Sequence, residues 1–244
     1  MTGPKELEPI AARAWRAGEE AALGGWRLYA SAGFSGRINA CWPLAAPDRP
    51  LAEAIAAVEA WYAARGLKPI FKIVPAAEEP AGLTAALAAG GYRPRTRTLM
   101  MTGPVAGEAD ATVRVASELD AAFEAVFAAA GTGDPGDTRE RLEALGRIVP
   151  PRGFARIDVE GAPAAIGAAA VEGEWAGIFG MRTDPAYRRR GLARAVLASL
   201  LAFARGAGAR RAYLQVEADN ASAIALYGSA GFETVYSYQY WDRR

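Results

Sequence analysis

The hexapeptide Arg188-Arg189-Arg190-Gly191-Leu192-Ala193 decides how the second half of this chain is interpreted. It follows a strand-like stretch, and the apolar residues after it repeat at helical spacing. Glycine lets the backbone approach a bound anion closely, and the first amides of a helix have no partners within that helix. The helix dipole and the neighbouring arginines both favour negative charge there, so a pyrophosphate fits this position. A solvated basic turn has the same sequence signature, so the surrounding elements must distinguish the two interpretations.

Strands and helices alternate around the hexapeptide in a defined order. Periodicity and turn residues predict strands at 112–115, 154–159, 164–172, 175–183, 212–218 and 232–241, and helices at 118–129, 137–148, 191–207 and 221–229. This order is typical of a mixed α/β (α+β) domain in which helices interrupt a mostly antiparallel sheet.

The hexapeptide, taken with its flanking segments, resembles the Arg/Gln-x-x-Gly-x-Gly/Ala signature of the GNAT superfamily of N-acetyltransferases. Phe179–Tyr187 (FGMRTDPAY) is similar to the exit of that family's fourth strand. Leu214–Val216 and Asn220–Tyr227 resemble its fifth strand and following helix, and Ala230–Phe232 resembles the entry to the next strand. The similarity is clearest between residues 177 and 235. It implies a GNAT fold, a mixed and mostly antiparallel sheet flanked by helices.

The resemblance also implies acetyl-CoA as the co-substrate, with no metal. Backbone groups at the fourth-strand exit would pair with the pantetheine arm, and amides at the helix start would hold the pyrophosphate. Asn220 would lie near the pantetheine, although a helix N-cap explains this asparagine equally well. The residues implied for acetyl-CoA binding are Met181, Arg182, Thr183, Arg188, Arg189, Arg190, Gly191, Leu192, Ala193, Arg194, Asn220 and Tyr227.

Tyr227 occupies the position of the tyrosine that commonly protonates the departing CoA thiolate in the family. A phenol keeps its proton at neutral pH and is a suitable acid there, but an aromatic residue packed on the sheet would also fit. The base that takes the proton of the amine is less defined: Glu174, Glu172 and Glu217 are candidates at strand ends, or solvated charges. Proximity and the reactivity of the thioester offer a route without a dedicated base.

Composition excludes several other classes. The chain has 244 residues, no histidine and one cysteine, Cys41, so it has no Ser-His-Asp or Cys-His catalysis, no zinc cluster and no intrachain disulfide. The single cysteine and the charged N-terminus predict a cytoplasmic protein. The 28 basic and 27 acidic side chains nearly cancel, which argues against nucleic-acid and membrane partners. A nucleic-acid surface made by Arg188–Arg190 with Arg210 and Arg211 is the weaker alternative.

The first half contains an echo of the second. Gly103–Asp110 (GPVAGEAD) is the best linker, giving a degenerate GNAT-like lobe over residues 1–104 and a catalytic domain over residues 111–244. The strand 69–75, the helix 83–89 and the strand 92–101 repeat the order that ends the chain, which suggests a duplicated unit or a chance similarity of alanine-rich helices.

The first lobe lacks the hexapeptide signature. Leu87 stands where Tyr227 would be, so this lobe is not expected to bind CoA in the same way, although it could wall one side of the acceptor cleft. Its side chains Arg27, Arg37, Asn39 and Trp42 offer substrate contacts or, more simply, surface and packing roles.

The sequence therefore predicts an N-acetyltransferase in which an unidentified primary amine attacks acetyl-CoA directly in a ternary complex. Cys41 lies outside the matched domain and has no histidine to activate it, so no acyl-enzyme is expected. A non-catalytic acyl-CoA sensor or scaffold is the alternative. The protein could be a monomer or a homodimer, with a terminal strand containing Tyr236, Tyr238, Tyr240 and Trp241 available for pairing.

Overall fold

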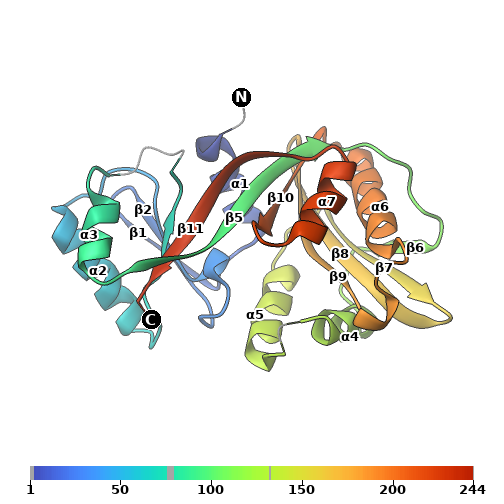
Figure 1. Cartoon of the computed structure of the whole chain (residues 1–244), viewed down its shortest axis with the longest axis horizontal. Coiled ribbons are helices and arrows are strands. Elements are labelled where there is room, and N and C mark those ends of the chain that lie inside the picture. The colour runs from blue at the N-terminus through green and yellow to red at the C-terminus, as the bar shows by residue number, and fades with distance from the viewer. Residues whose placement is uncertain (1–2, 76–79, 132, 244) are drawn as a thin grey trace. The chain divides into compact units, whose positions relative to one another are not determined.

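The computed structural model describes residues 3–75, 80–131 and 133–243 (Figure 1). The chain divides into two compact units: the first comprises Met1–Leu99, Glu217–Asp219 and Val235–Arg244, and the second comprises Met100–Val216 and Asn220–Thr234. Strands β5 (Arg93–Pro104) and β11 (Glu233–Asp242) contribute residues to both units. The unit boundary falls inside β5 rather than in the segment 103–110, and the last strand completes the first unit. The partner of a strand is not encoded in the strand's own periodicity, which is why the sequence placed all of residues 111–244 in one domain.

The first unit is a sheet with two helices that follow its strands and a third at the N-terminus. Its elements are α1 (Pro4–Ala14), β1 (Glu19–Leu23), β2 (Trp26–Ala30), the 3₁₀ turn η1 (Gly36–Ile38), β3 (Cys41–Pro43), α2 (Leu51–Ala63), β4 (Phe71–Ile73) and α3 (Leu83–Ala89). The strands lie in the order β1-β2-β3-β4-β11-β5. β3 and β4 are parallel, and β11 runs antiparallel to β4 with Trp241 opposite Phe71.

The core of the first unit contains many aromatic side chains, and the terminal strand is part of it. Tyr236 and Tyr238 are buried, and β11 lies between β4 and β5. The expectation that this aromatic strand is available for pairing with a second copy is therefore wrong, because β4 and β5 already occupy the two edges of β11. Leu87 is fully buried in the cluster that includes Tyr62 and Phe71.

A buried ion pair lies inside the first unit. Lys72 and Glu8 have no exposed side-chain surface and pair with each other. The hydroxyl of Tyr236 donates to Glu8 Oε1 at 2.8 Å, and the Lys72 ammonium lies 3.7 Å from the centre of the Trp42 ring and 4.0 Å from that of Tyr238. Burial lowers the pKa of Lys72, whereas the carboxylate of Glu8 favours its charged form. Trp42 thus has a packing role in the first unit.

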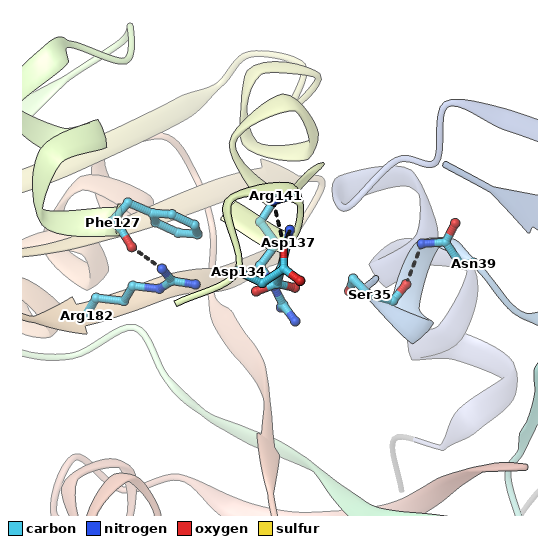
Figure 2. A network of polar contacts seen from close by, with 8 residues as sticks. Ser35, Asn39, Phe127, Asp134, Asp137, Arg141 and Arg182 are labelled. Carbon is cyan, nitrogen blue, oxygen red and sulfur yellow. Dashed lines mark hydrogen bonds and ion pairs between the residues drawn. The ribbon is translucent and has the colours of Figure 1, made fainter. Parts of the chain in front are cut away.

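Asn39 is likewise a structural residue. Its Oδ1 accepts hydrogen bonds from the amides of Ser31 (2.7 Å) and Gly33 (2.9 Å), and its Nδ2 donates to the Ser35 carbonyl at 2.9 Å (Figure 2). The side chain is buried, so it fixes the loop 31–39 from within. Of the two roles considered from the sequence, substrate contact or packing, the structure shows packing and structural roles for Asn39 and Trp42.

The second unit places helices on both faces of its sheet. Its elements are β6 (Val113–Ala116), α4 (Ala121–Ala129), α5 (Pro135–Gly146), β7 (Arg152–Val159), β8 (Ala162–Glu172), β9 (Trp175–Thr183), the 3₁₀ turn η2 (Pro185–Tyr187), α6 (Leu192–Gly206), β10 (Arg211–Glu217) and α7 (Ala221–Ser229). The strand order is β10-β9-β8-β7-β6, antiparallel except for the parallel pair β9–β10. A Cβ added at Gly167 would meet Val196 and Leu200 of α6, and one added at Gly180 would meet Phe127 of α4, so these helices cover opposite faces.

Along the chain, both halves show the same succession: an antiparallel hairpin, a third strand, a helix, a strand parallel to the third, a second helix and a long strand. The parallel pair is β3–β4 in the first unit and β9–β10 in the second. This agrees with the predicted echo between the halves, and its origin in duplication remains a prediction.

Within the described residues, no helix is both long enough and apolar enough to cross a membrane. The same residues contain no group of three or more Cys, Asp or Glu side chains arranged to hold a metal ion.

Candidate functional site

The second unit contains a cavity of about 1110 Å³ where β9, α6 and α7 meet. Most of the residues that the sequence singled out contribute to it. The lining consists of Ala130, Met181, Arg182, Thr183, Tyr187, Arg188, Arg189, Gly191, Leu192, Ala193, Arg194, Asn220, Ser222, Ala223, Ala225, Leu226 and Tyr227.

A bulge in β9 creates one wall of this cavity. The register of β8 and β9 shifts between Ile166 and Ala168, opposite Gly180, whose φ of 59° is the left-handed conformation that glycine adopts most readily. β10 pairs with β9 only over Trp175–Ile178, before the bulge. Met181–Thr183, after the bulge, lies along the cavity. A bulge bends its strand, and here it leads the end of β9 away from β10.

The turn before α6 forms a second wall. Gly191 is the N-cap of α6 with a φ of 79°, and Arg189 has a φ of 61° although it is not glycine. A side chain in that conformation is strained by roughly 1–3 kcal/mol, and such strain concentrates at functional sites. Successive amides in turns of this kind converge on a concave surface that binds anions. A Cβ added at Gly191 would meet no atom within 4 Å, so this position faces open space.

One side of α7 forms the third wall. Asn220 caps the helix by accepting a hydrogen bond from the Ala223 amide at 3.1 Å, and it also lines the cavity, so its two interpretations are compatible. Tyr227 lies two turns further along, where its mostly buried ring is 6.2 Å from that of Phe232. Arg194 of α6 donates to the Ser229 hydroxyl at 3.3 Å, a contact that joins α6 to α7.

Arg182 is fixed by α4 through its side chain. Its Nη1 donates to the carbonyl oxygen of Phe127, and its guanidinium carbon lies 3.5 Å from the centre of the Phe127 ring (Figure 2). On α5, Arg141 Nε donates to Asp137 Oδ1 at 2.6 Å. Burial, and to a lesser extent the charge of Arg141, lowers the pKa of Arg182 to about 10. The residue therefore remains a cation at neutral pH.

The candidate bases are not brought into the cavity. Glu174 lies in the turn that precedes β9, where its carbonyl accepts from the amides of Arg210 and Arg211, and Thr183 is at the other end of the strand. Met181, the first residue of β9 that lines the cavity, is seven residues beyond Glu174, which corresponds to about 23 Å of strand, and Glu172 is at the same end. This distance argues against either carboxylate as the base. Glu217 ends β10, is exposed and belongs to the first unit.

The same separation corrects the idea of one basic surface. Arg211 begins β10 opposite Trp175 at the start of β9, with Arg210 just before it, whereas Arg188–Arg190 follows the end of β9. Arg190 does not line the cavity. Its exposed guanidinium lies 5.6 Å from the centre of the Tyr187 ring.

Several lining residues were not among those expected from the sequence. Ser222, Ala223, Ala225 and Leu226 come from α7, and their spacing around Asn220 and Tyr227 could have marked one helical face. Tyr187 belongs to the recognised motif but was given no role. Ala130, just after α4, has no signal in the local sequence, because only the tertiary fold brings α4 to the end of β9.

A family model, curated relatives and solved structures all relate this chain to N-acetyltransferases. Residues 4–241 match the family model "Probable histone acetyltransferase Rv0428c C-terminal". The chain is 26% identical, over the full length of both proteins, to the "Uncharacterized N-acetyltransferase YobR" of Bacillus subtilis. A segment of 52 residues is 52% identical to the "N-alpha-acetyltransferase RimI" of Mycobacterium tuberculosis, covering 21% of this chain and 31% of that protein.

The fold has a similar relative among solved structures. The "GCN5-related N-acetyltransferase from Kribbella flavida" aligns with a TM-score of 0.67 over 97% of this chain and 95% of that one, at 21% identity.

Proposed function

The chain belongs to the GNAT superfamily of N-acetyltransferases, and from this membership we propose that it transfers an acetyl group from acetyl-CoA to a primary amine within a ternary complex. One observation carries the proposal: the turn that starts α6, the end of β9 beyond its bulge and Tyr227 of α7 all line one cavity. An anion site, a strand edge and a proton donor are the three parts that such a transfer needs.

The binding of acetyl-CoA would use backbone more than side chains. The pyrophosphate would sit on the amides between Arg189 and Arg194, where two left-handed residues and the start of the α6 dipole favour an anion. Arg188 and Arg189 line the same space and add positive charge. The pantetheine arm would run along Met181–Thr183, past the point where β10 pairs with β9.

The chemistry is direct aminolysis of the thioester. The amine nitrogen forms a bond to the carbonyl carbon, the carbon–sulfur bond breaks, and the thiolate takes a proton from the Tyr227 hydroxyl. A phenol is a suitable donor because it is protonated at neutral pH. A thiol is a stronger acid than a phenol, so the phenolate formed would be reprotonated, in the overall balance by the proton that the amine nitrogen releases. The nitrogen loses one proton in the same reaction.

That proton would leave through water. Among the described residues that line the cavity, none is Asp or Glu, which supports a mechanism without a dedicated carboxylate base. Holding the amine and the thioester together supplies much of the acceleration, since fixing two reactants replaces a bimolecular encounter by an intramolecular one. The fully buried Cys41 has a raised pKa and lies in the core of the first unit, which supports the absence of a cysteine acyl-enzyme and suits a reducing, cytoplasmic setting.

Thermal unfolding with and without acetyl-CoA tests the binding half of the proposal. At a hundredfold excess over Kd, binding should stabilise the protein by about 2.7 kcal/mol, which raises its melting temperature by roughly 5–11 °C. Release of free thiol in the presence of a panel of primary amines tests the transfer. A thermal shift without thiol release, with the Tyr227→Phe variant behaving like the wild type, would favour a sensor. The absence of any shift at saturating acetyl-CoA would refute the proposal.

A further inference from the structure

Arg182 is an arginine with an unusual charge environment. It is half-buried at the wall of the cavity, and its Nη1 donates to a neutral acceptor, the Phe127 carbonyl. Among the described residues, no carboxylate lies within 4.0 Å of its guanidinium. A cation that is taken out of water is normally paired with an anion. Arg182 has no such carboxylate partner in the part of the chain that the structure describes, so its guanidinium is suited to binding an anionic ligand.

Other arginines of the second unit show the usual pattern. Arg141 pairs with Asp137 at 2.6 Å, Arg152 pairs with Glu118 at 2.6 Å, and Arg156 pairs with Asp158 at 2.9 Å. The charge of Asp137 favours the cationic form of Arg182, but this carboxylate already accepts a hydrogen bond from Arg141. The ion pair between Arg141 and Asp137 is neutral in sum, so it does not supply Arg182 with a carboxylate partner of its own.

The side of the sheet on which Arg182 lies indicates which substrate would meet it. Successive strand residues point to opposite faces. Met181 contacts the face covered by α6, since its sulfur is the nearest atom to a Cβ built at Gly167, beside Val196 and Leu200. Arg182 packs on Phe127 of α4, on the opposite face. The CoA pyrophosphate would be held at the start of α6, so an anion on Arg182 comes from the other side.

We propose that Arg182 is a specificity-determining residue that binds a carboxylate carried by the amine acceptor. The inference rests on the proposed function and narrows its substrate class to amines that bear a nearby carboxylate, such as free amino acids. The Phe127 carbonyl and ring hold the guanidinium plane in place. The edge formed by Nε and Nη2 then offers the parallel pair of donors that a carboxylate accepts.

Two bisubstrate probes test the proposal without turnover. In both, the sulfur of coenzyme A is joined through an acetyl bridge to an amine nitrogen, that of leucine in one and that of leucinamide in the other. They differ only in the carboxylate. Isothermal titration calorimetry should give a Kd roughly 10- to 100-fold lower for the leucine probe with the wild-type protein, as expected for one charge-assisted contact. In Arg182→Met the two probes should bind about equally.

Controls separate this result from general damage. Arg182→Lys keeps the charge without the planar fork, so it should retain only part of the preference. Arg139→Met removes an exposed arginine of α5 that does not line the cavity, so this variant should keep the full preference for the leucine probe. The Kd of acetyl-CoA should be the same in Arg139→Met as in the wild type. For the Arg182 variants the ratio of the two probe Kd values is compared, because any change in affinity for the shared coenzyme A part cancels in that ratio.

Three outcomes would overturn the proposal. Equal binding of the two probes by the wild type, with normal acetyl-CoA affinity, removes the inference and leaves the proposed function standing. A preference that persists in Arg182→Met assigns the carboxylate to another residue. An Arg182-dependent preference for succinyl-CoA over butyryl-CoA, without one for the leucine probe, would assign the carboxylate to the acyl donor. Failure of acetyl-CoA to bind the wild type would instead refute the proposed function.

Discussion

Replacing Gly191 by alanine tests the cavity at its most constrained point. Gly191 has a φ of 79° at the N-cap of α6, and a Cβ there would meet no protein atom within 4 Å. The conformational penalty of a left-handed alanine is about 1–2 kcal/mol, which lowers the melting temperature by roughly 2–8 °C. The same methyl group would stand in the cavity where the pyrophosphate approaches the backbone. Loss of one amide–phosphate contact should weaken acetyl-CoA binding about 10- to 100-fold.

Gly66 provides a matched control. It has a φ of 66° and equally open surroundings, but it lies in the first unit, outside the cavity. Gly66→Ala should therefore lose a similar amount of stability and keep the wild-type affinity for acetyl-CoA. Unfolding curves give the stabilities, and calorimetric titration with acetyl-CoA gives the affinities.

Two results would refute the reasoning. If both variants bind acetyl-CoA like the wild type, the start of α6 does not hold the pyrophosphate closely. If both lose affinity in proportion to their loss of stability, the effect of Gly191→Ala arises from general destabilisation and says nothing about the site.

Further changes test the other parts of the structure. Tyr227→Phe should lower kcat by roughly 100-fold or more and leave acetyl-CoA affinity unchanged, measured by thiol release and calorimetry; an unchanged kcat would remove its role as acid. Lys72→Met leaves Glu8 buried without its partner and should cost about 3–5 kcal/mol in urea unfolding of the first unit, whereas the double change with Glu8→Leu should cost less. Burial raises the pKa of Asp120, but hydrogen bonds from the Phe123 amide and from Arg156 outweigh it and hold that pKa below 3.8. The stabilisation is therefore present above pH 3.8 and lost below it, so Asp120→Ala should cost about 1 kcal/mol at pH 7 and converge with the wild type in acid unfolding.

Local sequence determined much of the fold of the second unit. The strand Trp175–Thr183 and the helix Ala221–Ser229 lie at the predicted residues, because period-2 and period-3.6 patterns are set by neighbouring residues. The start of α6 at Gly191 was predicted for the same reason, since a glycine-containing turn before an apolar helix is a local signal. The residues expected to bind acyl-CoA were chosen from short local motifs between Met181 and Tyr227, and most of them line one cavity.

Tertiary structure decided what depends on residues distant in the sequence. The last strand belongs to the first unit because β11 pairs with β4, and no pattern within β11 specifies that partner. Glu174 is next to β9 in the sequence, yet the length of the strand carries it away from the cavity, so proximity in sequence was misleading. Arg182 was expected to contribute only its backbone. Its side chain acquires a defined position because the fold brings Phe127 of α4, 55 residues earlier in the chain, against the end of β9.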